Sequence, residues 1–127
     1  MKRVIGLGGI FFKSSNPAEL RDWYKKHLGL NTQEWGTTFN WKAPDEETGE
    51  ACSVWNPFKN ETNYFEPSQK QFMINYVVHD LDALLEQLKI EGVKIIGDKQ
   101  ESEYGKFGWI LDPEENKIEL WEPPKKQ

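Results

Sequence analysis

Apolar positions along the chain follow two periods, three to four residues in some stretches and two in others. The helical period appears as two stripes, Leu20, Trp23, Tyr24 and Leu28 and then Leu81, Leu84, Leu85 and Leu88. Asn16 and Asp80 precede the stripes as capping residues, and Gly29 and Gly92 follow them, where glycine favours the end of a helix. The pattern therefore predicts two amphipathic helices.

The other apolar runs alternate with polar residues or are bounded by turn residues, as β-strands are. The expected strands cover residues 9–13, 37–42, 51–55, 72–78, 93–96, 107–111 and 117–121. We interpret the order as strand, helix and three strands, twice. Because each unit is too small to bury its helix face alone, this order favours the duplication of one unit. The chain is thus predicted to be one α+β domain of two tandem βαβββ repeats, at about 4–58 and 71–123, with a linker at about 59–70.

Composition and charge narrow the class of protein. The 127 residues are 37% hydrophobic and 29% charged, which fits a globular domain, and no apolar run reaches the length of a membrane span. The net charge of −5 opposes binding to nucleic acid, whose phosphates attract clustered Lys and Arg. The first residues show neither the apolar run nor the small-residue cleavage site that a signal sequence is expected to have, and the single cysteine, Cys52, excludes an intrachain disulfide. We expect a cytoplasmic protein with neither nucleic acid nor a membrane as partner.

Three features carry a resemblance to a known family. They are the repeat, the helix segment Trp23-Tyr24 with His27-Leu28-Gly29-Leu30, and the closing segment Asp112-Pro113-Glu114-Glu115-Asn116-Lys117-Ile118-Glu119-Leu120. Together they resemble the vicinal oxygen chelate superfamily of glyoxalases, ring-cleaving dioxygenases and bleomycin-resistance proteins. The resemblance implies a half-open, mostly antiparallel barrel around a cavity, and a homodimer. Glu115 replaces the Gly of the family's closing turn, so either Asn116 supplies the positive φ or Glu115 is strained.

The resemblance also implies where metal-dependent members hold their ion, on the first and last strands of each repeat. Counting back from the helices places the first-strand positions at Gly9 and Met73, and aligning the repeats places the last-strand positions at Ser53 and Glu119. Only Glu119 is a usual ligand, and a divalent cation needs several O or N donors. His27 and His79, at a helix end and a strand-to-helix turn, are interpreted as structural. We expect no cofactor; a divalent metal bound through other ligands stays open.

Strand alternation then predicts what lines the cavity if Glu119 faces inward. The candidate ligand-binding residues are Phe11, Trp41, Ser53, Trp55, Asn75, Trp109 and Trp121. Aromatic rings stack on flat groups and attract cations, and a buried carboxylate can fix a donor or act as a general acid or base. The sequence does not decide which face of the sheet Trp41 is on. The alternative to a ligand site is that all of these rings fill the barrel as core. Tyr64 and Phe65, on the linker, are expected to cover the mouth or to form a dimer edge.

Three functions remain open from the sequence. The favoured one is a glyoxalase-like or bleomycin-resistance-like protein that binds a small, flat organic molecule in an aromatic cavity without the family's usual metal. The second is an enzyme, a lyase, isomerase or dioxygenase, in which Glu119 is the acid–base group or a metal ligand. The third is a non-catalytic dimerisation module with a filled barrel. Fold alone does not choose among them.

Overall fold

The computed structural model describes residues 2–45 and 47–125. Its elements are, in order, β1 (Val4–Ser14), α1 (Pro17–Leu28), β2 (Thr37–Lys42), β3 (Glu50–Lys59), β4 (Phe72–Val78), α2 (Leu81–Ile90), β5 (Lys94–Ile95), β6 (Gln100–Ser102), β7 (Gly105–Leu111) and β8 (Lys117–Glu122). Both predicted helices are present, and the predicted α+β class is confirmed. After α1, an isolated bridge between Gln33 and Gly36 stands where the repeat pattern predicts a further strand.

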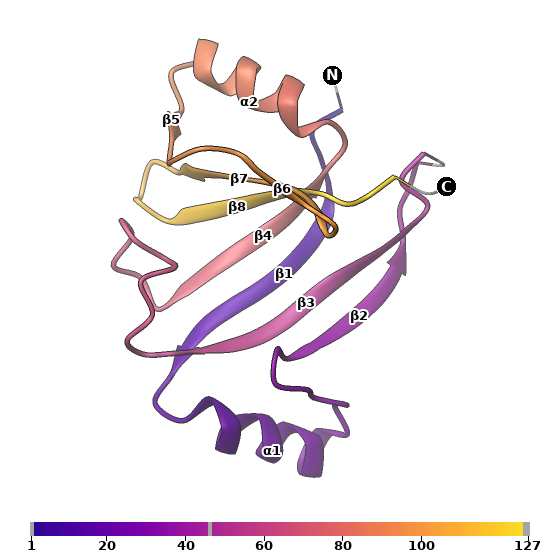
Figure 1. Ribbon diagram of the computed structural model, residues 1–127, viewed down its shortest axis with the longest axis vertical. Helices are drawn as coiled ribbons and strands as arrows, with labels where there is room; N and C mark the ends of the chain where they lie inside the picture. The colour runs from indigo at the N-terminus through magenta and orange to yellow at the C-terminus, as the bar shows by residue number, and fades with distance from the viewer. Residues whose placement is uncertain (1, 46, 126–127) are drawn as a thin grey trace.

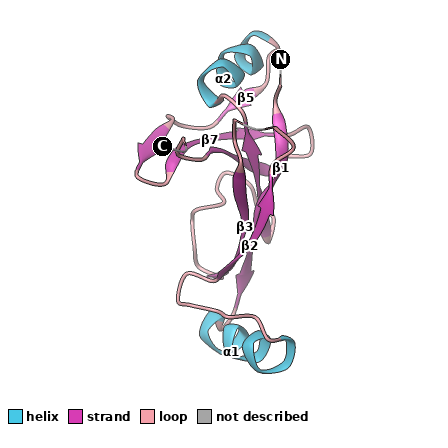
Figure 2. Ribbon diagram, turned by 90° about the vertical axis from the view of Figure 1, so that its right-hand side faces the viewer, coloured by secondary structure: helices cyan, strands magenta, loops and turns pink. Residues whose placement is uncertain are grey.

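All the strands form one mostly antiparallel sheet that curls without closing (Figure 1). The order is β2-β3-β1-β4-β8-β7-β5, with β6 pairing to β7. β1 and β4 meet antiparallel at its centre, and each has the last strand of its own half, β3 or β8, as its parallel neighbour. Figure 2 shows this sheet edge-on, with α1 and α2 at opposite ends of the molecule.

The helices begin and end where the sequence places their caps. The Asn16 side chain accepts the backbone N–H of Glu19 at 3.2 Å and donates to the Glu19 carboxylate at 3.0 Å, which is a reciprocal cap. Gly29 ends α1 with a φ of 70°. The Asp80 carboxylate caps α2 by accepting the N–H of Ala83 at 3.1 Å. Neither helix of the described chain is long and apolar enough to cross a membrane.

The core consists of two clusters on opposite faces of the sheet. The cluster under α2 is built on Val78, Leu81, Leu84, Ile110 and Leu120. The cluster on the other face is built on Phe11, Phe65, Met73 and Trp109. Trp109 and Ile110 are successive strand residues, so their side chains point to opposite faces. We call the face with Trp109 the concave face.

The closing turn between β7 and β8 depends on the side chain of Asp112. Its carboxylate accepts the backbone N–H groups of Glu114 and Asn116, each at 2.9 Å, and the Asn116 amide at 2.8 Å. Glu115 has a φ of 65°, so this residue adopts the left-handed conformation that the sequence left between Glu115 and Asn116. A left-handed conformation is unfavourable for a residue with a Cβ.

We predict that Glu115→Gly raises the free energy of unfolding by about 0.5–1 kcal/mol, because the relieved strain exceeds the added chain entropy. Urea unfolding measures the change. Glu114→Gly is the matched control: the residue is not in a left-handed conformation, so the glycine should lower stability by about 0.5–1 kcal/mol. Equal losses in both variants would show that Glu115 is not strained.

Candidate functional site

A row of paired residues crosses the concave face from one half of the chain to the other. Val54 of β3 pairs with Gly9 of β1, Gly9 pairs with Asn75 of β4, and Asn75 pairs with Glu119 of β8. Glu119 in turn pairs with Trp109 of β7. The sheet therefore places the one carboxylate of this row between an amide and an indole.

Glu119 is buried, with an exposed fraction of 2%, and its carboxylate receives three neutral donors. The Asn75 amide donates to Oε1 at 2.6 Å, and the Trp109 indole Nε1 donates to Oε2 at 2.9 Å. The hydroxyl of Tyr64 also donates to Oε2. A buried carboxylate is costly unless hydrogen bonds replace water, and these donors provide that replacement.

Tyr64 comes from the linker between β3 and β4, and its ring lies among aromatic neighbours. It stacks on Phe58 with ring centroids 5.7 Å apart and an angle of 14°, and it meets Trp109 edge-on at 6.3 Å. Burial, reinforced by the charge of Glu119, raises the pKa of the Tyr64 hydroxyl above its ordinary value. The hydroxyl therefore keeps its proton and remains a donor to Glu119.

Lys117 ties the linker to β8. Its Nζ donates to the backbone carbonyl of Tyr64 at 2.7 Å and lies 5.3 Å from the centroid of the Tyr64 ring and 5.6 Å from that of Trp109. Its exposed fraction is only 9%. Burial lowers the pKa of the Lys117 ammonium, and the charges of Glu119 and Glu66 oppose this effect.

A glycine makes room for the amide that holds Glu119. β1 is irregular between Leu7 and Gly9, and a Cβ at Gly8 would collide with Asn75 Oδ1. This oxygen is buried and has no hydrogen-bond partner among the described residues, whereas the nitrogen of the same amide donates to Glu119. The missing side chain at Gly8 thus allows the Asn75 orientation on which the carboxylate depends.

The structure brings some of the expected site residues together. Phe11, Asn75 and Trp109 lie with Glu119 on the concave face, as alternation predicts. Trp121 lies further along the same face of β8, where it stacks on Phe107 at 5.9 Å and donates to the Tyr104 carbonyl at 2.7 Å.

The expectation that Trp55 faces the cavity is wrong. Its ring packs on Tyr24 of α1, with centroids 4.6 Å apart, and on Phe12 at 5.5 Å. The reason is the parallel register of β1 and β3, which pairs Gly9 with Val54 and so turns Val54 inward and Trp55 outward.

Ser53 and Trp41 form a separate contact with the first half of β1. The Trp41 indole donates to the Ser53 hydroxyl at 3.0 Å, and that hydroxyl donates to the Leu7 carbonyl. The Trp41 ring lies against Gly6, where a Cβ would collide with it. Trp41 and Ser53 are therefore bonded to each other and to β1, and neither is one of the three donors of the Glu119 carboxylate.

The register also corrects two of the four positions at which the resemblance implies a metal site. In the row of paired residues, Val54 stands at the position that the sequence predicts for Ser53. Asn75 stands at the position that it predicts for Met73. The distance along the chain from the paired residue to the helix that follows is longer for Gly9 on β1 than for Asn75 on β4. Counting the same distance back from both helices therefore reaches Met73 and misses Asn75.

The corrected set does not fit a divalent metal. Gly9 and Val54 have no donor atom in their side chains, and the Asn75 nitrogen points to Glu119. Within residues 2–45 and 47–125, no group of three or more His, Cys, Asp or Glu side chains could hold a metal ion. His27 packs on Trp23 at 4.9 Å, and His79 faces Glu47 at 3.3 Å.

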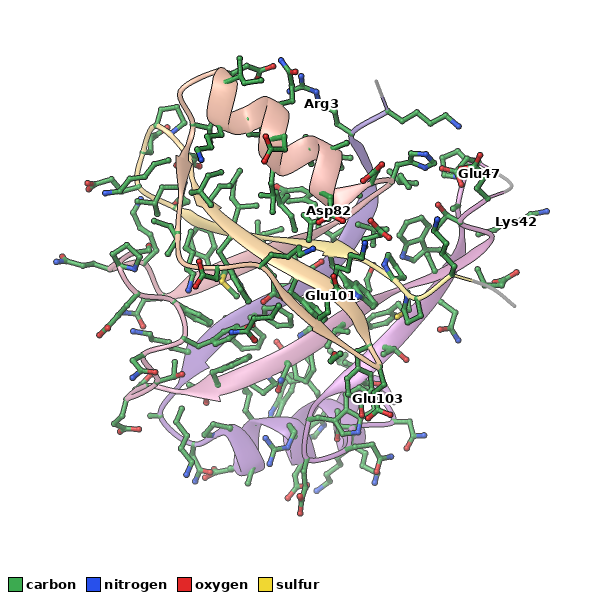
Figure 3. The ribbon with its side chains drawn as sticks, turned by 45° about the horizontal axis from the view of Figure 1, so that its top comes forward. Arg3, Lys42, Glu47, Asp82, Glu101 and Glu103 are labelled. Carbon is green, nitrogen blue, oxygen red and sulfur yellow. The ribbon has the colours of Figure 1, made fainter. Side chains whose placement is uncertain are left out.

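The concave face is packed where the sequence predicts an open cavity. Phe65 and Met73 are 1% and 0% exposed, and Tyr64 covers Glu119. A cleft of about 800 Å³ lies elsewhere, between the start of α2, the β2–β3 turn and the end of β8. Asp82 and Glu47 line it (Figure 3). Charged side chains make up half of its lining, and no Phe, Tyr or Trp is among the lining residues, so it does not suit a flat aromatic ligand.

Comparisons with known proteins agree on the fold. The family model described as Glyoxalase/Bleomycin resistance protein/Dioxygenase superfamily matches residues 13–120. A variant of methylmalonyl-CoA epimerase from Streptomyces coelicolor, in complex with 2-nitronate-propionyl-CoA, is similar with a TM-score of 0.67 and 13% identity over 98% of this chain and 99% of that one. The epimerase from Mycobacterium tuberculosis gives 0.59 and 17%, over 95% and 89%. A catechol 2,3-dioxygenase gives 0.58 and 19%, over 98% and 41%. A search of curated proteins finds no match.

We predict that Gly8→Ala lowers the free energy of unfolding by about 2–4 kcal/mol, because the added methyl displaces the Asn75 amide and removes a donor from buried Glu119. Chemical denaturation measures the loss. Gly108→Ala is the control, since its Cβ meets side-chain methyl groups, those of Leu85 at 3.0 and 3.4 Å and one of Leu81 at 3.5 Å, and no polar atom of the site. It should lose less than half as much; similar losses would contradict the role given to Gly8.

Proposed function

The chain belongs to the Glyoxalase/Bleomycin resistance protein/Dioxygenase superfamily, which confirms the resemblance in its closing segment, and from this premise we propose that it binds a small, flat organic molecule at Glu119 without a divalent metal. The observation that carries the proposal is a buried carboxylate that receives only neutral donors and is walled by aromatic rings. The ligand takes the place of Tyr64, whose side chain covers Glu119 in the free protein.

The residues around Glu119 favour a ligand with a flat face and one polar hydrogen. Phe58 and Trp109 present a face and an edge to the space that the Tyr64 ring fills. The Glu119 carboxylate accepts a hydrogen bond there, and bonds to a charged acceptor are about twice as strong as those between neutral groups. The rings therefore provide contact area, and the carboxylate provides orientation.

The covering side chain can leave without unfolding the concave face. Tyr64 is 36% exposed, whereas its neighbour Phe65 is 1% exposed and packs on Phe58 at 5.3 Å. Phe65 holds the linker on the sheet independently of Tyr64. Opening the site thus requires the Tyr64 side chain to move, which costs the hydroxyl bond to Glu119 and the stacking on Phe58.

A metal-free site is supported by the residues that stand where relatives hold an ion. Gly9 and Val54 offer no ligand atom, so an ion at Glu119 would have one carboxylate and mostly water around it. Divalent transition metals bind tightly where several protein ligands converge. The donors to Glu119 are neutral N–H and O–H groups, which a cation would have to displace.

A homodimer is part of the proposal. α1 has no buried residue, and the apolar side chains of Trp23, Leu28 and Trp35 are 50%, 61% and 51% exposed. Such exposed apolar groups are typical of surfaces that meet a partner. Pairing of two chains through this end of the molecule would cover them.

We expect flat aromatic compounds, neutral or cationic, to raise the melting temperature of the tag-free protein, and Zn²⁺, Ni²⁺, Mn²⁺ or Fe²⁺ to give no stoichiometric response in Trp fluorescence. Glu119→Gln should abolish most of the stabilisation because the acceptor loses its charge. Glu103→Gln, at an exposed turn residue (Figure 3), is the control and should keep it. Stoichiometric metal that is lost in Glu119→Ala would contradict the proposal.

A further inference from the structure

The space beside Glu119 already holds a phenol, the side chain of Tyr64. We define the phenol site as Phe58, Trp109, Lys117 and Glu119, the residues that contact this side chain. From its contacts we infer that the ligand is a hydroxyarene, a neutral aromatic molecule with a hydroxyl on its ring. The inference rests on the proposed function and specifies its ligand class.

Each part of the phenol has a matching partner. Phe58 covers one face of the ring, nearly parallel at 14°, and the Trp109 ring stands at 87° to it. The Lys117 ammonium lies over the ring 5.3 Å from its centroid, a position that favours an electron-rich π-system. The hydroxyl donates to Glu119 Oε2. A hydroxyarene in the same position makes all of these contacts.

The hydroxyl distinguishes this class from other flat molecules. Glu119 is 2% exposed, so water does not readily replace a donor that leaves. A ligand that displaces Tyr64 and brings no donor leaves Oε2 with only the Trp109 indole. Sites built around a hydroxyl reject analogues that lack it, because a buried polar group is then left unpaired. An aryl ether or a hydrocarbon fills the same volume and fails this condition.

The electrostatics favour a neutral hydroxyarene over a phenolate. The ionised form would bring a second negative charge against the carboxylate of Glu119, and Lys117 lies over the ring while its Nζ donates to the Tyr64 carbonyl. Like charges at this separation in a buried site repel strongly. The ligand therefore binds as the protonated donor, as Tyr64 does.

The experiment measures the binding of phenol, anisole and toluene by calorimetry to the wild-type chain and to Tyr64→Ala, which empties the phenol site. Phenol should bind Tyr64→Ala about tenfold more tightly than anisole or toluene, since only phenol restores the donor. It should bind the wild type more weakly than the variant, because Tyr64 competes. Adding Glu119→Gln should remove most of the preference for phenol.

Phe65→Ala is the matched control from the same linker. It empties a volume among Phe58 and the concave core, while Lys117 still binds the Tyr64 carbonyl, so that Glu119 keeps its Tyr64 donor. This variant should bind toluene at least as well as phenol. A preference for phenol in both variants would mean that any cavity in this face prefers phenol, and it would overturn the assignment of the phenol site.

Other outcomes separate the two proposals. If anisole and toluene bind Tyr64→Ala as tightly as phenol, the hydroxyarene class is wrong and the flat-ligand proposal stands. If no aromatic compound binds the wild type or the folded variant, both proposals fail. If Tyr64→Ala does not fold, Tyr64→Phe replaces it: its ring has no hydroxyl bond to Glu119, so phenol should bind about tenfold more tightly than to the wild type. Equal binding would contradict the inference.

Discussion

The burial of the Glu119 carboxylate is the constraint on which the concave face depends. A charged group with an exposed fraction of 2% requires hydrogen bonds in place of water. The donors come from three separate parts of the chain, the amide of Asn75 on β4, the indole of Trp109 on β7 and the hydroxyl of Tyr64 on the linker. Satisfying one carboxylate therefore fixes the relative positions of β4, β7, β8 and the linker.

The same constraint explains why the concave face is closed. Tyr64 reaches Glu119 only because the linker folds back over the sheet, and Lys117 and Phe65 hold it there through a backbone carbonyl and through apolar packing. A divalent metal would need several ligands at the paired positions. Here Gly9 and Val54 occupy two of them, and neutral donors surround the remaining carboxylate. Under the proposed function, such a site recognises the shape of a ligand and its hydrogen-bond donor.

Local signals in the sequence are sufficient to predict the helices and strands. The site, in contrast, depends on the pairing of strands that are far apart in the sequence. Caps at Asn16 and Asp80 fixed the helices, and alternation around Glu119 placed Asn75 and Trp109 correctly. The sequence predicts the wrong face for Trp55 because its orientation depends on the parallel register of β1 and β3, and aligning the two repeats gives this register only to within one residue. For Tyr64 the sequence leaves two roles open, a cover of the mouth or a dimer edge, since a linker has no periodicity that could show where its side chains point.

The most direct test is a spectrophotometric pH titration of Tyr64, taken as the difference between the wild-type protein and Tyr64→Phe in the tyrosinate band. Because burial and the charge of Glu119 raise the pKa of this hydroxyl above its ordinary value of 10.0, the difference should show almost no tyrosinate at about pH 10–11, and ionisation should begin only at higher pH. A full single-tyrosine signal with a midpoint near 10.0 would show that the hydroxyl does not face a buried carboxylate, and it would contradict the central role given to Glu119.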